Sequence, residues 1–113
     1  MTNQELFDKC LTHLRQQGQR SVNESGECMY RAPDGGMCAI GALIPDEKYD
    51  PNFENRSAAH NPVWQATDLT EDQLPLALTI QRQMHDMAFG DFRTELEIRA
   101  HQVAAEFGLC YTT

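Results

Sequence analysis

Apolar positions in the first eighteen residues recur at helical spacing. Thr2 followed by Glu5 fits a capping box, in which each side chain satisfies a backbone N–H of the first turn. Gly18 suits the left-handed end of a helix. The pattern predicts an amphipathic helix between these positions. Its apolar face holds Leu6, Phe7, Cys10, Leu11 and Leu14.

Two further helices are predicted in the C-terminal third. The first begins at Thr70, with Gln73 as its capping partner, and ends before Gly90. The second ends at Gly108. We expect the two to form an antiparallel pair. Their apolar faces hold Leu76, Ile80, Met84 and Met87 in the first, and Phe92, Leu96, Ala100, Val103 and Phe107 in the second.

Between the N-terminal helix and this pair the pattern changes. Residues 20–31 place the turn formers Asn23 to Gly26 between two short segments, which predicts a small β-hairpin packed on the helices. Residues 37–44 are apolar and suit a strand or a short buried helix, and their small residues before Pro45 favour the helix. Residues 46–67 are predicted to be mostly loop. The expected fold is therefore α+β, as a single domain over residues 1–113.

Composition fits one folded domain inside the cell. A chain of 113 residues with 41% apolar content can build one modest core. No apolar run is long enough to span a membrane, and no secretory signal is visible, so a cytoplasmic location is expected. The four cysteines have no CxxC spacing, which favours free thiols over a disulfide framework.

The chain is acidic, with 17 Asp and Glu residues, 9 Lys and Arg residues and a net charge of -8. This balance opposes binding to DNA and to anionic membranes. It promotes solubility, and it also suits a partner protein with a basic groove.

Cys38 is the candidate nucleophile because it follows a glycine-rich turn and precedes an apolar segment. A helix N-terminus at this point would lower its thiol pKa. Catalysis would also require His60, His85 or His101 to meet it in space. A buried structural cysteine fits the same pattern.

A zinc site would have to draw on distant residues, namely Cys28, Cys38, His60 and either Cys10 or Cys110. This spacing lacks the ligand pairs of the common zinc motifs, so no metal is expected. The chain also has neither a Walker loop nor a dinucleotide fingerprint, and no cofactor is expected.

The stretch "RAPDGGM" offers a candidate anion site. Backbone N–H groups at Gly35, Gly36 and Met37, next to Asp34, could bind a phosphate, with Arg31 pairing to it. A nucleotide or another small anion would be the ligand. The same residues also suit an ordinary turn.

Aromatic residues flank this stretch in the chain. If they are exposed, they form a contact surface for a protein partner. They are Tyr30, Tyr49, Phe53 and Trp64.

The stretch "CMYRAPDGGMCAIGALIPDEKYDP" resembles a group of small proteins encoded by bacteriophages, prophages and bacteria, with the pattern C-x-Y-R-x-P-x-G-x-x-C-A-x-G-x-L-I-P-D-x-x-Y. The match covers about a quarter of the chain. The resemblance implies a biological context and no particular reaction. Small acidic phage proteins often bind a host protein, including components of antiviral defence.

Three functional hypotheses follow. The first is a non-enzymatic protein that inhibits or sequesters a host macromolecule through the surface between Tyr30 and Trp64. The second is a sponge that sequesters a nucleotide or small anion at Arg31 and the glycine turn. The third is a cysteine hydrolase or transferase using Cys38. Apolar residues beside the main helix faces also suggest a homodimer.

Overall fold

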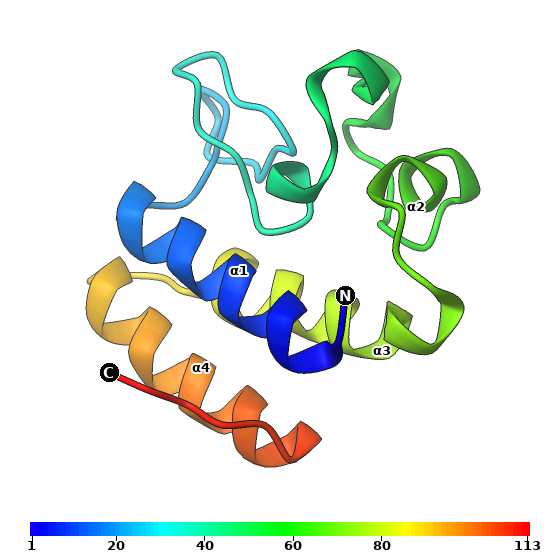
Figure 1. Cartoon of the computed structure of the whole chain (residues 1–113). Coiled ribbons are helices and arrows are strands. Elements are labelled where there is room, and N and C mark those ends of the chain that lie inside the picture. The colour runs from blue at the N-terminus through cyan, green and yellow to red at the C-terminus, as the bar shows by residue number, and fades with distance from the viewer.

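The computed structural model describes residues 1–113 and contains four α-helices, 3-10 turns and one π-helical segment. Figure 1 shows α1, α3 and α4 packed together, with residues 18–60 and α2 on one side of them and the C-terminal tail along α4. We call residues 18–60 the loop layer. The helical segments are α1 (Asn3–Gln17), α2 (Asn61–Thr67), α3 (Leu74–Thr79), the π-helical η5 (Ile80–Asp86) and α4 (Phe92–Phe107).

The N-terminal helix is confirmed together with its capping signals. Thr2 accepts the backbone N–H of Glu5, and the Glu5 carboxylate accepts the backbone N–H of Thr2 at 2.8 Å. Gly18 ends the helix in the left-handed region at φ 72°. The buried face is the predicted one, and it consists of Leu6, Phe7, Cys10, Leu11 and Leu14.

The C-terminal helices are also present, with one difference. The segment expected to be a single α-helix from Thr70 begins with a 3-10 turn and changes to π winding at Ile80. At its end the Met87 N–H donates to the Arg82 carbonyl at 2.9 Å, which is a spacing of five residues. α4 ends at Gly108, as predicted.

The α+β prediction is wrong because the chain contains no β-strand. The expected hairpin over residues 20–31 is reduced to an isolated bridge between Val22 and Cys28, and a second bridge joins Arg31 and Met37. Instead of pairing in a ladder, these segments donate backbone N–H groups to side chains elsewhere, namely Ser21 to His85, Met37 to Gln17, and Tyr30 and Arg31 to Glu54. A single 3-10 turn, Gly41–Leu43, forms within the apolar stretch.

Residues 46–67 contain one helix that the sequence did not reveal. Helix α2 begins at Asn61 and has Pro62 in its first turn, where the missing N–H of proline costs little. We expected residues 46–67 to be mostly loop, so this helix is a correction. The rest of the segment consists of turns and the 3-10 helices Asp46–Lys48 and Pro51–Phe53.

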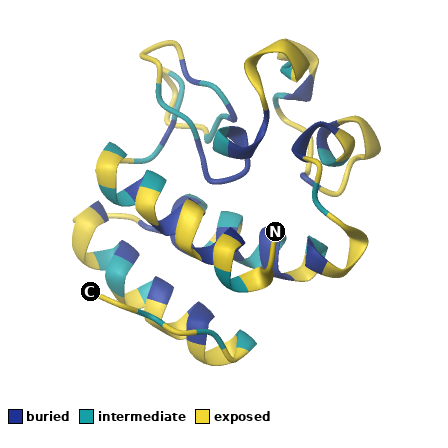
Figure 2. Ribbon diagram, viewed as in Figure 1, coloured by how far each residue is buried: buried dark blue, intermediate teal, exposed yellow.

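The core joins both layers. A single cluster of 25 buried apolar residues runs from Leu6 in α1 through Ile40 in the loop layer to Ala104 in α4. Figure 2 shows the buried positions on the facing sides of the helices and along the inner part of the loop layer. No helix is both long enough and apolar enough to cross a membrane.

Candidate functional site

A cavity of about 530 Å³ lies between the loop layer and the helix formed by α3 and η5. Apolar side chains such as Tyr30 and Leu78 form part of its wall, and the rest is polar. Its lining residues are Cys28, Met29, Tyr30, Cys38, Asn55, Arg56, Ser57, Ala58, Pro75, Leu78, Thr79, Gln81, Arg82 and Asp86.

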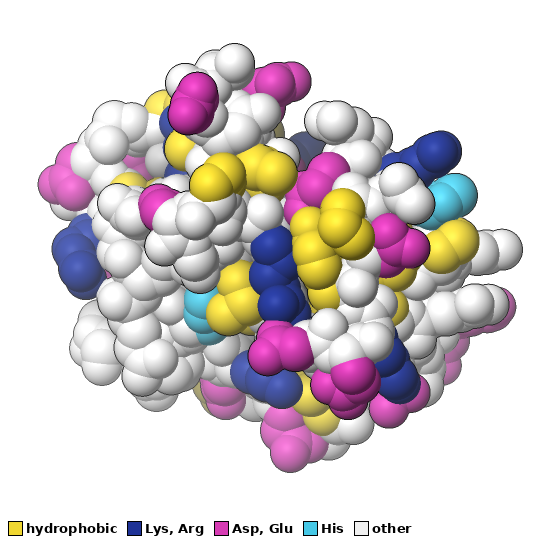
Figure 3. All heavy atoms as spheres, turned by 90° about the horizontal axis from the view of Figure 1, so that it is seen from above, with side chains coloured by type: hydrophobic (Ala, Val, Ile, Leu, Met, Phe, Trp, Pro, Cys, Tyr) yellow, Lys and Arg dark blue, Asp and Glu magenta, His cyan; other side chains and the backbone are white.

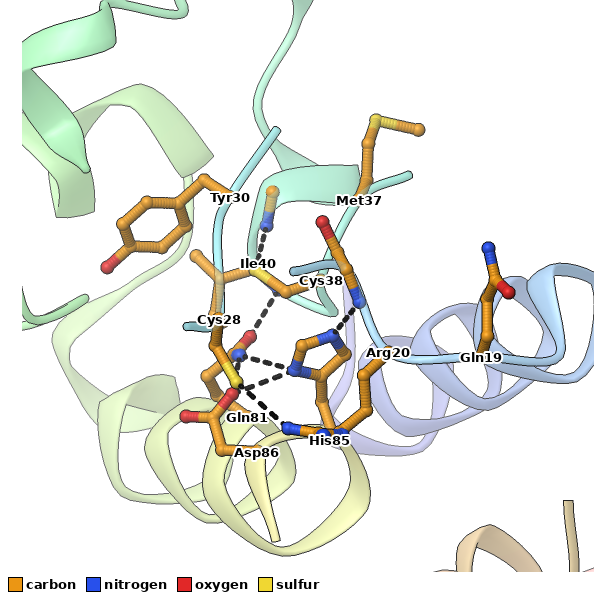
Figure 4. Close-up of polar contacts among 12 residues, drawn as sticks. Gln19, Arg20, Cys28, Tyr30, Met37, Cys38, Ile40, Gln81, His85 and Asp86 are labelled. Carbon is orange, nitrogen blue, oxygen red and sulfur yellow. Dashed lines mark hydrogen bonds and ion pairs between the residues drawn. The ribbon is translucent and has the colours of Figure 1, made fainter. Parts of the chain in front are cut away.

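The π winding of η5 gathers a polar cluster at one end of this cavity. Gln81 Nε2 donates to Asp86 Oδ1 at 2.7 Å, across five residues. In an α-helix, residues five apart point about 140° away from each other around the axis. A π-helix closes its backbone hydrogen bonds over five residues, so it brings these two side chains to the same side. Figure 4 shows them next to His85.

His85 is fully buried and links the two layers as a neutral imidazole. Its Nε2 lies 2.8 Å from the backbone N of Ser21 and accepts that N–H. Because Nε2 is an acceptor, the ring proton lies on Nδ1, which donates to Asp86 Oδ1 at 2.8 Å. His85 therefore fixes the Asp86 carboxylate and holds the loop layer on η5.

Cys28, His85 and Asp86 have the spacing of metal ligands, since their donor atoms lie within 4.8 Å of one another. The hydrogen bonds argue against such a site. A metal at Nδ1 would displace the ring proton, and Nε2 would then need a proton where the Ser21 N–H already points. The residues considered for zinc from the sequence do not gather into a ligand cluster.

The two cysteines near the cavity are in environments that favour the neutral thiol. Burial raises the pKa of Cys38, whose Sγ accepts the Gly41 N–H at 3.3 Å and forms no hydrogen bond with a histidine. Burial, followed by the Asp86 carboxylate, raises the pKa of Cys28. His60 and His101 are exposed. This arrangement gives the cysteine-nucleophile hypothesis no activated thiol.

Two arginines at the cavity lack a carboxylate partner. Arg56 and Arg82 line it, and neither takes part in a salt bridge. By contrast, Arg31 pairs with Asp46 at 2.7 Å, and Arg15 pairs with Glu97 at the same distance. Free guanidinium groups at a cavity are suited to bind an anion.

Most of the backbone donors in the glycine turn proposed for anion binding already have an acceptor. The Asp34 carboxylate accepts the Gly36 N–H at 2.8 Å, and the Ala32 carbonyl accepts that of Gly35 at 3.0 Å. Arg31 is held by Asp46 and by the Ile44 carbonyl. The Met37 N–H donates to Gln17 at 2.8 Å, so that of Asp34 is the one backbone donor from Asp34 to Met37 without an acceptor.

The aromatic residues do not form an exposed surface. Tyr30 and Phe53 are buried, while Tyr49 and Trp64 are partly buried against the core. Figure 3, which views the loop layer from outside, shows apolar side chains in separate groups between charged ones. Tyr30 instead contributes to the cavity wall, and its hydroxyl donates to the Arg56 carbonyl.

The sequence analysis did not identify Gln81, Asp86, Arg56 or Arg82 as site residues. An α-helical period places Gln81 and Asp86 on different sides of the helix. The two arginines are 26 positions apart in the chain, so the sequence does not indicate that they are neighbours. The histidine at position 85 was considered only as a base for Cys38. The adjacent residues His85 and Asp86 were the one feature of the sequence that could have indicated this polar cluster.

Comparisons with protein families, curated proteins and solved structures found no match to this chain. The resemblance to phage-encoded proteins therefore stays a prediction. Function is inferred below from the cavity and the residues around it.

Proposed function

We propose that the protein is a non-enzymatic binding protein whose ligand is a small organic anion in the cavity under the loop layer. The observation that carries the proposal is the pair Arg56 and Arg82. Both line one cavity without a carboxylate partner, in a chain with a net charge of -8. The sponge hypothesis is thus retained, and its site moves from the glycine turn to this cavity.

Geometry and electrostatics support this choice. A guanidinium binds phosphate or carboxylate oxygens through two parallel N–H donors. The cavity volume of about 530 Å³ falls in the range of small-molecule sites. Its wall combines the ring of Tyr30 with the hydroxyls of Ser57 and Thr79, which suits an organic anion better than a bare ion.

Isothermal titration calorimetry with inorganic phosphate, citrate and ribose 5-phosphate tests the proposal. We expect at least one organic anion to bind more tightly than phosphate. The double variant Arg56→Gln and Arg82→Gln should weaken this binding about tenfold or more, since each charged hydrogen bond is worth about 1.5–3 kcal/mol. Lys9→Gln is the matched control, because Lys9 is exposed on α1 and does not line the cavity.

Two results would contradict the proposal. One is the absence of binding by all three anions at millimolar concentration and low ionic strength. The other is equal affinity in the double arginine variant and in Lys9→Gln, because binding would then not depend on the cavity.

A host protein as partner stays a prediction, with a different surface from the one expected. Phe89 and Met87 are 60% and 40% exposed after the end of η5, whereas Tyr30 and Phe53 are buried. Exposed apolar side chains of this kind are the ones that protein partners cover. The phage-type context and the inhibition of an antiviral component rest on the sequence resemblance alone.

A further inference from the structure

We infer that the ligand is a phosphorylated sugar, bound with its phosphate at Arg56 and Arg82 and its hydroxyl groups at Asp86. The inference rests on the proposed function and names the ligand class of the same cavity. The shared chemistry is an anion joined to a vicinal diol. It occurs both in free sugar phosphates and in nucleoside monophosphates.

The cavity has an acceptor at Asp86 in addition to its guanidinium donors. The Oδ1 atom of Asp86 is occupied by Gln81 Nε2 at 2.7 Å and by His85 Nδ1 at 2.8 Å. The two hydrogen bonds to the Asp86 side chain both involve Oδ1, and the Cys28 thiol beside this carboxylate is only a weak donor. Asp86 lines the cavity, and its side chain is 37% exposed. One carboxylate oxygen is therefore anchored, and the other is free for a ligand.

The anchoring makes Asp86 a preorganised group. Two donors from η5 fix its orientation, and His85 is itself fixed by the Ser21 N–H. A ligand that binds Oδ2 does not have to order this side chain, so less conformational entropy is lost on binding.

The surrounding charge favours hydroxyl groups over an ammonium group at Asp86. Arg82 lines the same cavity. On the other side, Arg20 Nη1 lies 3.9 Å from Cys28 Sγ, and Cys28 lies beside Asp86. These guanidinium groups repel a cationic amine, whereas a neutral hydroxyl donates to the carboxylate without that repulsion. A diol offers two such donors, and carboxylates bind ribose hydroxyls in this way in dinucleotide sites.

Calorimetry with three ligands on the full chain tests the inference. Ribose 5-phosphate and adenosine 5′-monophosphate carry both the phosphate and the diol. The 2′,3′-dideoxy analogue of adenosine 5′-monophosphate keeps the phosphate and lacks the diol. We expect the analogue to bind about tenfold or more weakly than adenosine 5′-monophosphate, since hydrogen bonds to a charged group are lost.

The variant Asp86→Asn tests whether the Asp86 carboxylate binds the hydroxyl groups of the ligand. Asparagine keeps an oxygen for Gln81 and His85, and replaces the free carboxylate oxygen by an amide. We expect the preference for the diol ligand over its dideoxy analogue to fall several-fold, while phosphate-dependent binding persists. If this variant does not fold, the comparison of ligands on the unmodified chain decides alone.

The outcomes separate this inference from the proposed function. Equal affinities for adenosine 5′-monophosphate and its dideoxy analogue would overturn the sugar assignment and leave the anion site standing. No binding of any phosphate compound or of citrate would overturn both. Tighter binding of the nucleotide than of ribose 5-phosphate would identify a nucleotide as the source, and equal binding of the two would identify a free sugar phosphate.

Discussion

Gly41 lies so close to the backbone of Tyr30, within the loop layer, that a side chain has no room. A Cβ atom at this position would lie 2.8 Å from the carbonyl carbon of Tyr30 and even closer to its oxygen. These atoms belong to the backbone, which cannot relieve the clash by a rotamer change as a side chain can. We therefore expect Gly41→Ala to lower the free energy of unfolding by about 2 kcal/mol or more.

Urea denaturation followed by circular dichroism measures this effect. Gly36→Ala is the control, because its nearest obstacle is the side chain of Asp34 at 3.1 Å. An equal unfolding midpoint for the two variants would show that the close contact between Gly41 and the Tyr30 backbone does not determine the loss of stability.

Residue types in the sequence revealed donors and acceptors but not which of them already had partners. Arg31 fits an anion site by its charge and position, yet Asp46 neutralises it. The backbone N–H groups of Tyr30 and Arg31 do bind a carboxylate, but it belongs to Glu54, at 2.9 and 3.1 Å. Such pairing depends on tertiary contacts between residues 15 to 24 positions apart, which no local pattern reports.

At the scale of elements, α1 and α4 are tied by an ion pair that the C-terminal segment extends. Arg15 donates two hydrogen bonds to Glu97 at 2.7 and 2.9 Å, and the hydroxyl of Tyr111 donates to the same carboxylate. The hydrogen bond from Arg15, followed by that from Tyr111, holds the pKa of Glu97 below its usual value of 4.5.

This pairing predicts a pH-dependent contribution to stability. A lowered carboxyl pKa stabilises the folded state above the unfolded value near 4.5, and this stabilisation is lost as the pH falls through the folded value. Glu97→Gln should therefore cost about 1 kcal/mol or less at pH 7, since the pair is partly exposed. The difference from the unmodified chain should shrink below pH 4.5.

Chemical denaturation between pH 3 and pH 7 tests this expectation. Glu106→Gln is the control, because Glu106 is exposed on the same helix and forms no hydrogen bond through its side chain. A constant difference between Glu97→Gln and the unmodified chain across this range would contradict the assignment.

The sequence predicted helices correctly where apolar residues recur at helical spacing over a long segment and capping residues mark its ends. This was the case for α1, which has its capping box at Thr2, and for α4, which ends at Gly108. The π winding from Ile80 was missed because it alters the spacing by one residue within an otherwise helical pattern. The hairpin was wrong because turn formers at Asn23 to Gly26 specify a reversal of the chain and do not ensure that its arms pair.

At the scale of the whole molecule, side chains of other segments bind the backbone of the loop layer. The N–H of Ser21 donates to His85, that of Met37 to Gln17 and that of Ile40 to Gln81, at 2.8 to 3.0 Å. These acceptors come from α1 and η5, so the loop layer is attached to the helices and does not form a sheet of its own.

Hydrogen exchange should reveal this attachment. We expect the amides of Ser21, Met37 and Ile40 to exchange about a thousandfold more slowly than those of Glu24 and Asp34, which donate no hydrogen bond. Residue-resolved exchange measured by NMR provides the test. Fast exchange at all five positions would show that the loop layer opens independently of the helices.

The same attachment means that the shape of the loop layer is encoded largely outside it. A segment held through its main-chain N–H groups can change many of its own side chains and keep its conformation. By contrast, a single substitution at Gln17, Gln81 or His85 removes the acceptor of a loop-layer N–H group that is distant in the sequence. Grafted onto another scaffold, residues 19–41 would lose their conformation. Randomised in place, the tips at Glu24 and Asp34 offer a display surface whose geometry the helices maintain.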